Sequence, residues 1–183
     1  MKFNIQNTCV YGLDNAIKAS GNPMRTVINH DEVNEKDINR ALKLGQAVPG
    51  SGHDNFLKGI IVQFDVTAPL YWWKQAQRYH WLDFVSSQST MHCLLKFNVR
   101  EQCVKETDER IITIVEALVS EYNNLPDDDP TKKDKWRTLV ASLPCGFCLG
   151  ATMTTNYQQL KTIYNQNAPT KVSTFEPFLH KAR

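Results

Sequence analysis

Residues 52–80 read GHDNFLKGIIVQFDVTAPLYWWKQAQRYH. Glycine and polar residues open this segment as a loop, and the run from Leu57 to Val66, which is rich in Ile and Val, predicts a strand. Pro69 suits the first turn of a helix, and the pattern then becomes helical. We therefore expect His53 at the mouth of a strand and Arg78 near the end of a helix. Residues held in such places are well aimed for binding.

Shorter elements precede this segment. Apolar and polar residues alternate over most of Phe3–Tyr11, which predicts a strand that enters the core. Asp14 is expected to cap a short helix that ends at Ser20. Asp37 is expected to precede a second short helix, which Gly45 closes.

Longer helical patterns follow it. Residues 107–124 carry an apolar stripe at helical spacing with Glu and Arg opposite, so they predict a long amphipathic helix. Asp129 or Thr131 is expected to cap another helix, which Pro144 terminates. A further helix is expected to begin near residue 154.

Length and charge limit the kind of protein. The chain has 183 residues and a mass of 21.0 kDa, which suits one domain over residues 1–183. The C-terminal tail shows no residue pattern that would end the fold, which leaves open that the natural protein continues. A net charge of +2 argues against a broad basic surface for a nucleic-acid polymer, but it allows a local anion pocket. No apolar run approaches the roughly 20 residues of a membrane span and no secretory signal opens the chain, so a cytoplasmic protein is expected.

The chain has five cysteines, an odd number, so free thiols in a reducing compartment are expected rather than a disulfide framework. Cys145 and Cys148 form one close pair, with His92 and Cys93 as further candidate ligands. A zinc site commonly needs two such pairs. The favoured interpretation is therefore that Cys145 and Cys148 are two small buried residues, and no metal ligand is assigned.

Several motifs at fixed spacing carry a resemblance to a known family. Gly52-His53 leads into the predicted strand, Ala68-Pro69 opens the helix, and Gln75 stands three residues before Arg78-Tyr79-His80. A Ser-rich segment follows at residues 86–89, and Leu143-Pro144 and Thr154-Thr155-Asn156-Tyr157-Gln158 come later. This arrangement resembles the flavin-dependent thymidylate synthases, the ThyX family. The resemblance implies an α+β fold, in which a small antiparallel or mixed sheet packs with helices in a single domain.

The sequence departs from the family pattern at positions where cations are expected. The family's Arg-His-Arg triplet is Arg78-Tyr79-His80 here, so an imidazole replaces a guanidinium group that is always charged. Gln158 stands where the family has an arginine in its flavin segment. A substrate-phosphate arginine is replaced by Val140, with Arg137 about one helical turn earlier.

The resemblance implies two groups of binding residues and no catalytic side chain. The flavin would contact Ser20, His53, Asn55, Arg78, Tyr79, His80, Asn156 and Gln158. The substrate nucleotide would contact Gln75, Arg78, Ser86, Ser87, Gln88, Ser89 and Arg137.

The residue types themselves are consistent with a nucleotide ligand. Arg78 suits a phosphate, because a guanidinium group can donate two parallel hydrogen bonds. Gln75 stands about one helical turn before Arg78, so both are expected to face one ligand. Trp72 and Trp73 suit stacking on a ring, but core packing is the favoured interpretation.

The chemistry that the resemblance implies is the methylation of dUMP to dTMP. FAD would be the cofactor, NADPH the hydride source and methylenetetrahydrofolate the carbon donor, in a homotetramer. The alternative is a diverged, non-catalytic protein that keeps the fold and binds a nucleotide or a flavin. The lost arginines favour this alternative, because each charge-assisted contact contributes roughly 1.5–3 kcal/mol.

Overall fold

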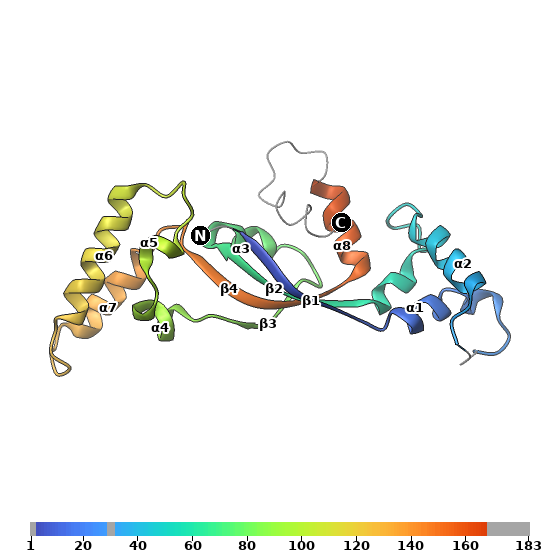
Figure 1. The fold of residues 1–183 in the computed structure, drawn as a ribbon, viewed down its shortest axis with the longest axis horizontal. Coiled ribbons are helices and arrows are strands. Elements are labelled where there is room, and N and C mark those ends of the chain that lie inside the picture. Colours follow the sequence, from blue (N-terminus) through green and yellow to red (C-terminus); the bar gives the residue numbers. More distant parts are fainter. Residues whose placement is uncertain (1–2, 29–31, 168–183) are drawn as a thin grey trace. The chain divides into compact units, whose positions relative to one another are not determined.

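The structure is a computed structural model, and it describes residues 3–28 and 32–167 (Figure 1). The strands are β1 (Asn4–Tyr11), β2 (Ile61–Pro69), β3 (Asp83–Ser87) and β4 (Cys148–Asn156). The α-helices are α1 (Leu13–Ala19), α2 (Glu35–Gly45), α3 (Leu70–Ala76), α4 (Thr90–Cys93), α5 (Val99–Gln102), α6 (Glu109–Asn123), α7 (Lys132–Ala141) and α8 (Tyr157–Asn167). Short 3-10 helices cover Asn22–Met24, Asn55–Gly59 and Leu94–Lys96.

The four strands form one antiparallel sheet in the order β1-β2-β4-β3 (Figure 1). Every second residue of β2 is buried, namely Val62, Phe64, Val66 and Ala68. Strand β4 buries Ala151, Met153 and Thr155 with the same period. This alternation places one set of side chains against the core. The predicted α+β fold is confirmed.

The chain divides into two compact units. The first holds Val66–Ala76 and Ser86–Ala151 with the described part of Met1–Asn4. The second holds Gln77–Val85 and the described parts of Ile5–Asp65 and Thr152–Arg183. Strands β2 and β4 each begin in one unit and end in the other. A single domain over residues 1–183 stays a prediction.

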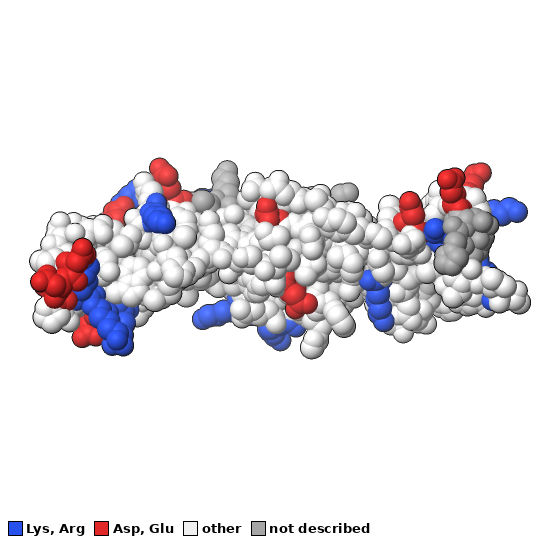
Figure 2. Space-filling view, turned by 90° about the horizontal axis from the view of Figure 1, so that it is seen from below, with Lys and Arg blue, Asp and Glu red and all other residues white. Residues whose placement is uncertain are grey.

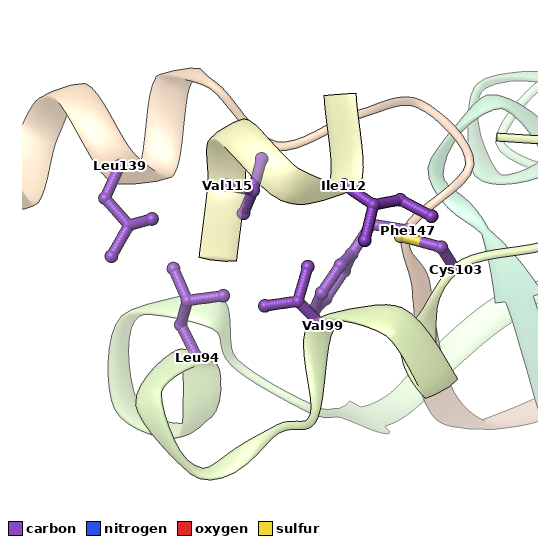
Figure 3. Packing of buried hydrophobic residues seen from close by; sticks show 7 residues of the cluster. All are labelled: Leu94, Val99, Cys103, Ile112, Val115, Leu139 and Phe147. Atoms are coloured by element: carbon purple, nitrogen blue, oxygen red, sulfur yellow. The ribbon is translucent and has the colours of Figure 1, made fainter. Parts of the chain in front are cut away.

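The first unit has a core built by three helices and the segments beside them. Its buried side chains are Leu94, Val99, Cys103, Ile112, Val115, Leu139 and Phe147 (Figure 3). They come from α5, α6, α7 and the turns around them, and Phe147 packs edge-on against Phe97 with ring centroids 5.8 Å apart. The long amphipathic helix predicted over residues 107–124 is confirmed as α6.

The second unit has a smaller core where α1 packs on the segment before β2. Ala16, Leu57 and Ile60 are buried there, with Phe56 packed against them. Gly12 precedes α1 with a φ of 74°, and a Cβ atom at this position would lie 2.6 Å from the carbonyl oxygen of Gly59. Only glycine allows both this conformation and this approach.

Three predicted helix starts are wrong by a few residues. Gly12, not Asp14, stands at the N-cap of α1. Asn34 caps α2, and Asp37 is its third residue, where its carboxylate closes a capping box with the backbone of Asn34. Pro69 ends β2 instead of opening a helix. Capping residues are interchangeable in type, so nearby candidates are difficult to rank.

Two strands were missed by the sequence analysis. Residues 148–156 form β4, so the helix expected near residue 154 begins only at Tyr157. The Ser-rich segment begins within β3, where Ser86 and Ser87 are exposed strand residues. The burial of side chains in β4 alternates with a period of two from Ala151 onward, but Leu149 and Gly150 interrupt this pattern at the start of the strand.

The five cysteines are free thiols, and the two members of the close pair, Cys145 and Cys148, differ in burial. Cys148 is buried, and its burial raises its pKa to about 11. Cys145 is exposed, so the prediction of two buried residues is wrong for Cys145. Within residues 3–28 and 32–167, no group of His, Cys, Asp and Glu side chains could hold a metal ion.

No helix among the described residues is both long enough and apolar enough to cross a membrane. On the face drawn in Figure 2, most of the surface is uncharged, and Lys and Arg side chains occur in several small groups, one of them beside Asp and Glu side chains.

Candidate functional site

The predicted binding residues fall in both units. The first unit holds Gln75, Ser86, Ser87, Gln88, Ser89 and Arg137, all predicted to bind substrate. The second holds Ser20, His53, Asn55, Arg78, Tyr79, His80, Asn156 and Gln158.

Arg78, Tyr79 and His80 lie in the turn that follows α3. Because α3 ends at Ala76, Arg78 does not share a helix face with Gln75, and that expectation is wrong. Arg78 and His80 are exposed, and neither forms a hydrogen bond or an ion pair with another described residue. No donor of the Arg78 guanidinium group is therefore used by the part of the chain that the structure describes.

The segment Ser86–Ser89 is tied to β4 by Gln88. The backbone N–H of Gln88 donates to the carbonyl of Gly150 over 2.8 Å, and its side-chain Oε1 accepts from the Gly150 N–H at 2.7 Å. The amide oxygen of Gln88 is therefore already used by the backbone of β4. The side-chain hydroxyls of Ser86, Ser87 and Ser89 form no hydrogen bond with the described residues, so they can donate to an anion.

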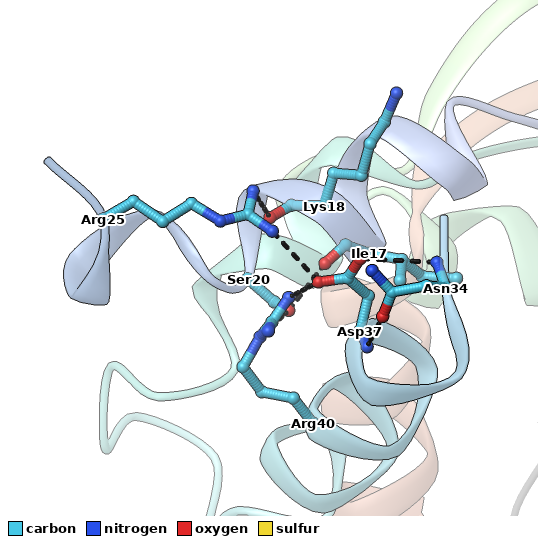
Figure 4. A network of polar contacts seen from close by, with 7 residues as sticks. All are labelled: Ile17, Lys18, Ser20, Arg25, Asn34, Asp37 and Arg40. Atoms are coloured by element: carbon cyan, nitrogen blue, oxygen red, sulfur yellow. Dashed lines mark hydrogen bonds and ion pairs between the residues drawn. The ribbon is translucent and has the colours of Figure 1, made fainter. Parts of the chain in front are cut away.

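Ser20 is committed to contacts inside the second unit. Its hydroxyl donates to the carbonyl of Ile17 over 2.6 Å and accepts from Nε of Arg40 at 3.2 Å (Figure 4). The residue is 8% exposed. A flavin contact by this hydroxyl would have to replace one of these bonds.

A buried carboxylate that the sequence analysis did not select joins the loop before β2 to helix α8. Asp54 is 0% exposed and accepts from Nζ of Lys161 at 2.8 Å and from Nε2 of Gln158 at 3.2 Å. Gln158 also donates to Oδ1 of Asn55 at 3.5 Å. His53, the predicted ligand next to Asp54, is exposed and takes no part in this cluster.

The charge state of Asp54 follows from these contacts. Burial alone would raise its pKa, but the hydrogen bonds from Lys161 and Gln158 and the charge of Lys161 outweigh burial and lower it. Asp54 is therefore a carboxylate at neutral pH. It neutralises the nearest cation of α8, and it uses the Gln158 amide that was predicted to contact the flavin.

Four further residues form contacts within the protein. Oδ1 of Asn156 accepts from the N–H of Gln159 at 2.9 Å, which satisfies the start of α8. Arg137 is exposed on α7 and pairs with Asp134 on the same helix, 3.1 Å away. Trp72 and Trp73 are buried, with ring centroids 4.9 Å apart, as expected for core packing.

The available donors suit one part of FAD better than another. Arg78, His80 and His53 are exposed and uncommitted among the described residues, so they fit the anionic diphosphate. Ser20, Asn156 and Gln158 have polar atoms that already bond to the protein. The exposed donors of the turn at residues 78–80 are therefore of a type that suits a phosphate group, and His53 stays a separate prediction.

No protein-family model and no curated protein matches the sequence. Solved structures share its fold. Thymidylate synthase X from Helicobacter pylori, crystallised with FAD and dUMP, superimposes with a TM-score of 0.69 at 15% identity, over 100% of this chain and 91% of that one. A second structure of that enzyme with the same ligands gives a TM-score of 0.69 at 14% identity, with the same coverage.

A methylase provides a further likeness. The UMP/dUMP methylase PolB from Streptomyces cacaoi, bound with 5-Br UMP, superimposes with a TM-score of 0.52 at 14% identity, over 89% of this chain and 75% of that one. Identities this low show the fold alone. The strand order, the helices and these likenesses together establish that the chain has the ThyX-like α+β fold which its motifs predicted.

Proposed function

We propose that the protein methylates dUMP to dTMP, with FAD as its cofactor, methylenetetrahydrofolate as carbon donor and NADPH as hydride source. The observation that carries the proposal is Arg78, which is exposed and uncommitted at the motif position where the family binds phosphate. The likeness in fold to an enzyme crystallised with FAD and dUMP supports it.

The residues of the chain bind and orient the ligands in this proposal. Arg78 donates two parallel hydrogen bonds to a phosphate, a geometry that lysine cannot reproduce. The hydroxyls of Ser87 and Ser89 donate to the phosphate oxygens of the nucleotide. FAD, when bound, supplies the hydride-transfer chemistry, so no side chain needs to act as a nucleophile.

The active form in this proposal is a homotetramer. Support comes from apolar side chains that the chain leaves exposed around β3, including Trp81 at 68% and Val85 at 55%. Burial of such side chains is a common driving force of association.

Separate titrations of FAD and dUMP test the proposal. The purified protein is expected to bind FAD, with an absorbance band at about 450 nm. It is then expected to oxidise NADPH in the presence of the folate and dUMP. Arg78→Gln is expected to weaken dUMP binding about tenfold or more, because it removes a charge-assisted contact. Asp128→Asn, at an exposed acidic turn, is the matched control. A colourless protein that neither takes up FAD nor oxidises NADPH contradicts the proposal.

The second candidate is a non-catalytic protein that keeps the fold and binds a nucleotide. One observation favours it: Ser20 and Gln158, both predicted to contact the flavin, are committed to internal hydrogen bonds. Binding of dUMP without uptake of FAD would support this candidate over the enzyme.

A further inference from the structure

Two arginines in the second unit share one buried carboxylate. Arg25 and Arg40 each donate through Nη2 to Oδ1 of Asp37, over 3.0 Å and 2.5 Å (Figure 4). Asp37 is 3% exposed, and among residues 3–28 and 32–167 it is the one carboxylate that pairs with either guanidinium group. Among the described residues, one negative charge therefore faces two positive charges.

Other contacts hold the two guanidinium groups without using all their donors. Nη1 of Arg25 donates to the carbonyl of Lys18 over 3.2 Å, and Nε of Arg40 donates to the hydroxyl of Ser20 over 3.2 Å. Each guanidinium group has five N–H donors, so both retain donors for a ligand. The two side chains are 22% and 29% exposed, which leaves them within reach of solvent.

Gly21 allows Arg40 to lie against the backbone. A Cβ atom at Gly21 would lie 2.6 Å from both the guanidinium carbon and Nη2 of Arg40, which is too close for either group to stay in place. The absence of a side chain at Gly21 thus permits the position of the guanidinium group beside Ser20.

We propose that Arg25 and Arg40 form a phosphate-binding site, with Ser20 and Asp37 holding them in position. The preference for phosphate follows from the chemistry of the pair: guanidinium groups match phosphate oxygens through parallel hydrogen bonds, and within residues 3–28 and 32–167 the two guanidinium groups share a single carboxylate. The site does not depend on the proposed methylation, because free diphosphate, the diphosphate of FAD and the monophosphate of dUMP share this chemistry.

Calorimetric titration of the full chain with pyrophosphate, FAD and dUMP tests the site. Arg25→Gln and Arg40→Gln each leave one arginine on Asp37, so the carboxylate keeps an ion pair. Each is expected to weaken pyrophosphate binding about tenfold or more. Arg110→Gln is the matched control, since Arg110 is an exposed arginine that pairs with Asp108. Gly21→Ala keeps both charges but displaces the Arg40 guanidinium group, and it is expected to give a smaller loss.

The three ligands separate the sources of the phosphate. A parallel loss of FAD affinity in both glutamine variants identifies the diphosphate of FAD, a loss for dUMP identifies the nucleotide, and a loss for pyrophosphate alone identifies a free anion. A loss of pyrophosphate binding in R25Q and R40Q supports this site even where the protein does not methylate dUMP, so failure of the proposed function is told apart from failure of this site. Equal pyrophosphate affinity in wild type, R25Q and R40Q, or no binding by wild type at about 10 mM, overturns the proposal. Thermal melts establish that each variant is folded.

Discussion

At the scale of single residues, Asp54 was the least predictable part of the candidate site. Motif matching drew attention to its neighbours His53 and Asn55, yet Asp54 is the residue that is fully buried and joined to α8. Residue type gives no sign of this, because the partners Gln158 and Lys161 lie more than 100 residues away in sequence. Arg78 was selected from its motif alone, and its role as a ligand contact stays a prediction.

Asp54→Asn is expected to destabilise the second unit. The substitution leaves the ammonium group of Lys161, which is 17% exposed, without its carboxylate, so the free energy of unfolding should fall by about 2–4 kcal/mol at pH 7. Urea unfolding followed by circular dichroism measures this loss. Asp128→Asn, at an exposed position, is the control and should change the free energy by less than about 0.5 kcal/mol.

The effect of Asp54→Asn should also depend on pH. The pKa of Asp54 is lowered in the folded state, so its contribution is fully present above the unfolded pKa of about 3.9 and is lost as the pH falls through the lower folded value. The difference in stability between wild type and variant should therefore be constant above about pH 5 and shrink below about pH 4. A difference that is independent of pH down to acid unfolding would contradict the assigned ion pair.

At the scale of helices and strands, prediction succeeded where one periodic pattern ran without interruption. Helix α6 has a continuous apolar stripe, and β2 has a run of branched residues, so both were found with shifted ends. Strand β4 was mistaken in part for a helix, because its pairing partners are remote in sequence and Gly150 breaks its pattern. Strand β3 was missed because all five of its residues are exposed. Without a buried face, a strand has no period of two to detect.

Gly12→Ala tests the junction between β1 and α1. The φ of 74° and the carbonyl of Gly59 at 2.6 Å both oppose a Cβ atom, so the loss of stability should exceed about 2 kcal/mol. Gly50→Ala is the matched control, because Gly50 has a φ of 85° with nothing within 4 Å of a Cβ atom. It should lose only about 1 kcal/mol from the backbone strain. Equal losses in urea unfolding would show that the contact with Gly59 is unimportant.

Gln88→Ala tests whether the side chain of Gln88 holds the Ser86–Ser89 segment on β4. Its removal leaves the N–H of Gly150 without its acceptor, so that amide should exchange with deuterium about five- to tenfold faster, which corresponds to about 1 kcal/mol. Gln88→Glu keeps an acceptor oxygen and should retain most of the protection. Unchanged exchange at Gly150 in the alanine variant would contradict this role.

At the scale of the whole molecule, the net charge says more about possible ligands than the rest of the composition does. The net charge of +2 argues against a broad basic surface, and the contacts show how several of the cations are used. Lys161 is neutralised by Asp54, whereas Arg25 and Arg40 share Asp37 and Arg78 has no partner among the described residues. These assignments could not be read from the sequence, because each depends on which carboxylate folding brings to each cation. A nearly neutral chain can therefore hold local anion sites.

Assembly is the last property that can be tested at this scale. Strand β3 ends the strand order, so one of its edges has no neighbouring strand among the described residues, and Val85 on it is 55% exposed. An exposed apolar edge strand favours association. Light scattering after size exclusion should therefore give about four times the chain mass of 21.0 kDa. Val85→Lys should lower the observed mass, because a charge on this edge opposes burial, whereas Val27→Lys, at a 75% exposed position outside the sheet, should leave it unchanged. A wild-type monomer would argue against the tetramer, and equal effects of the two lysines would argue against β3 as the contact.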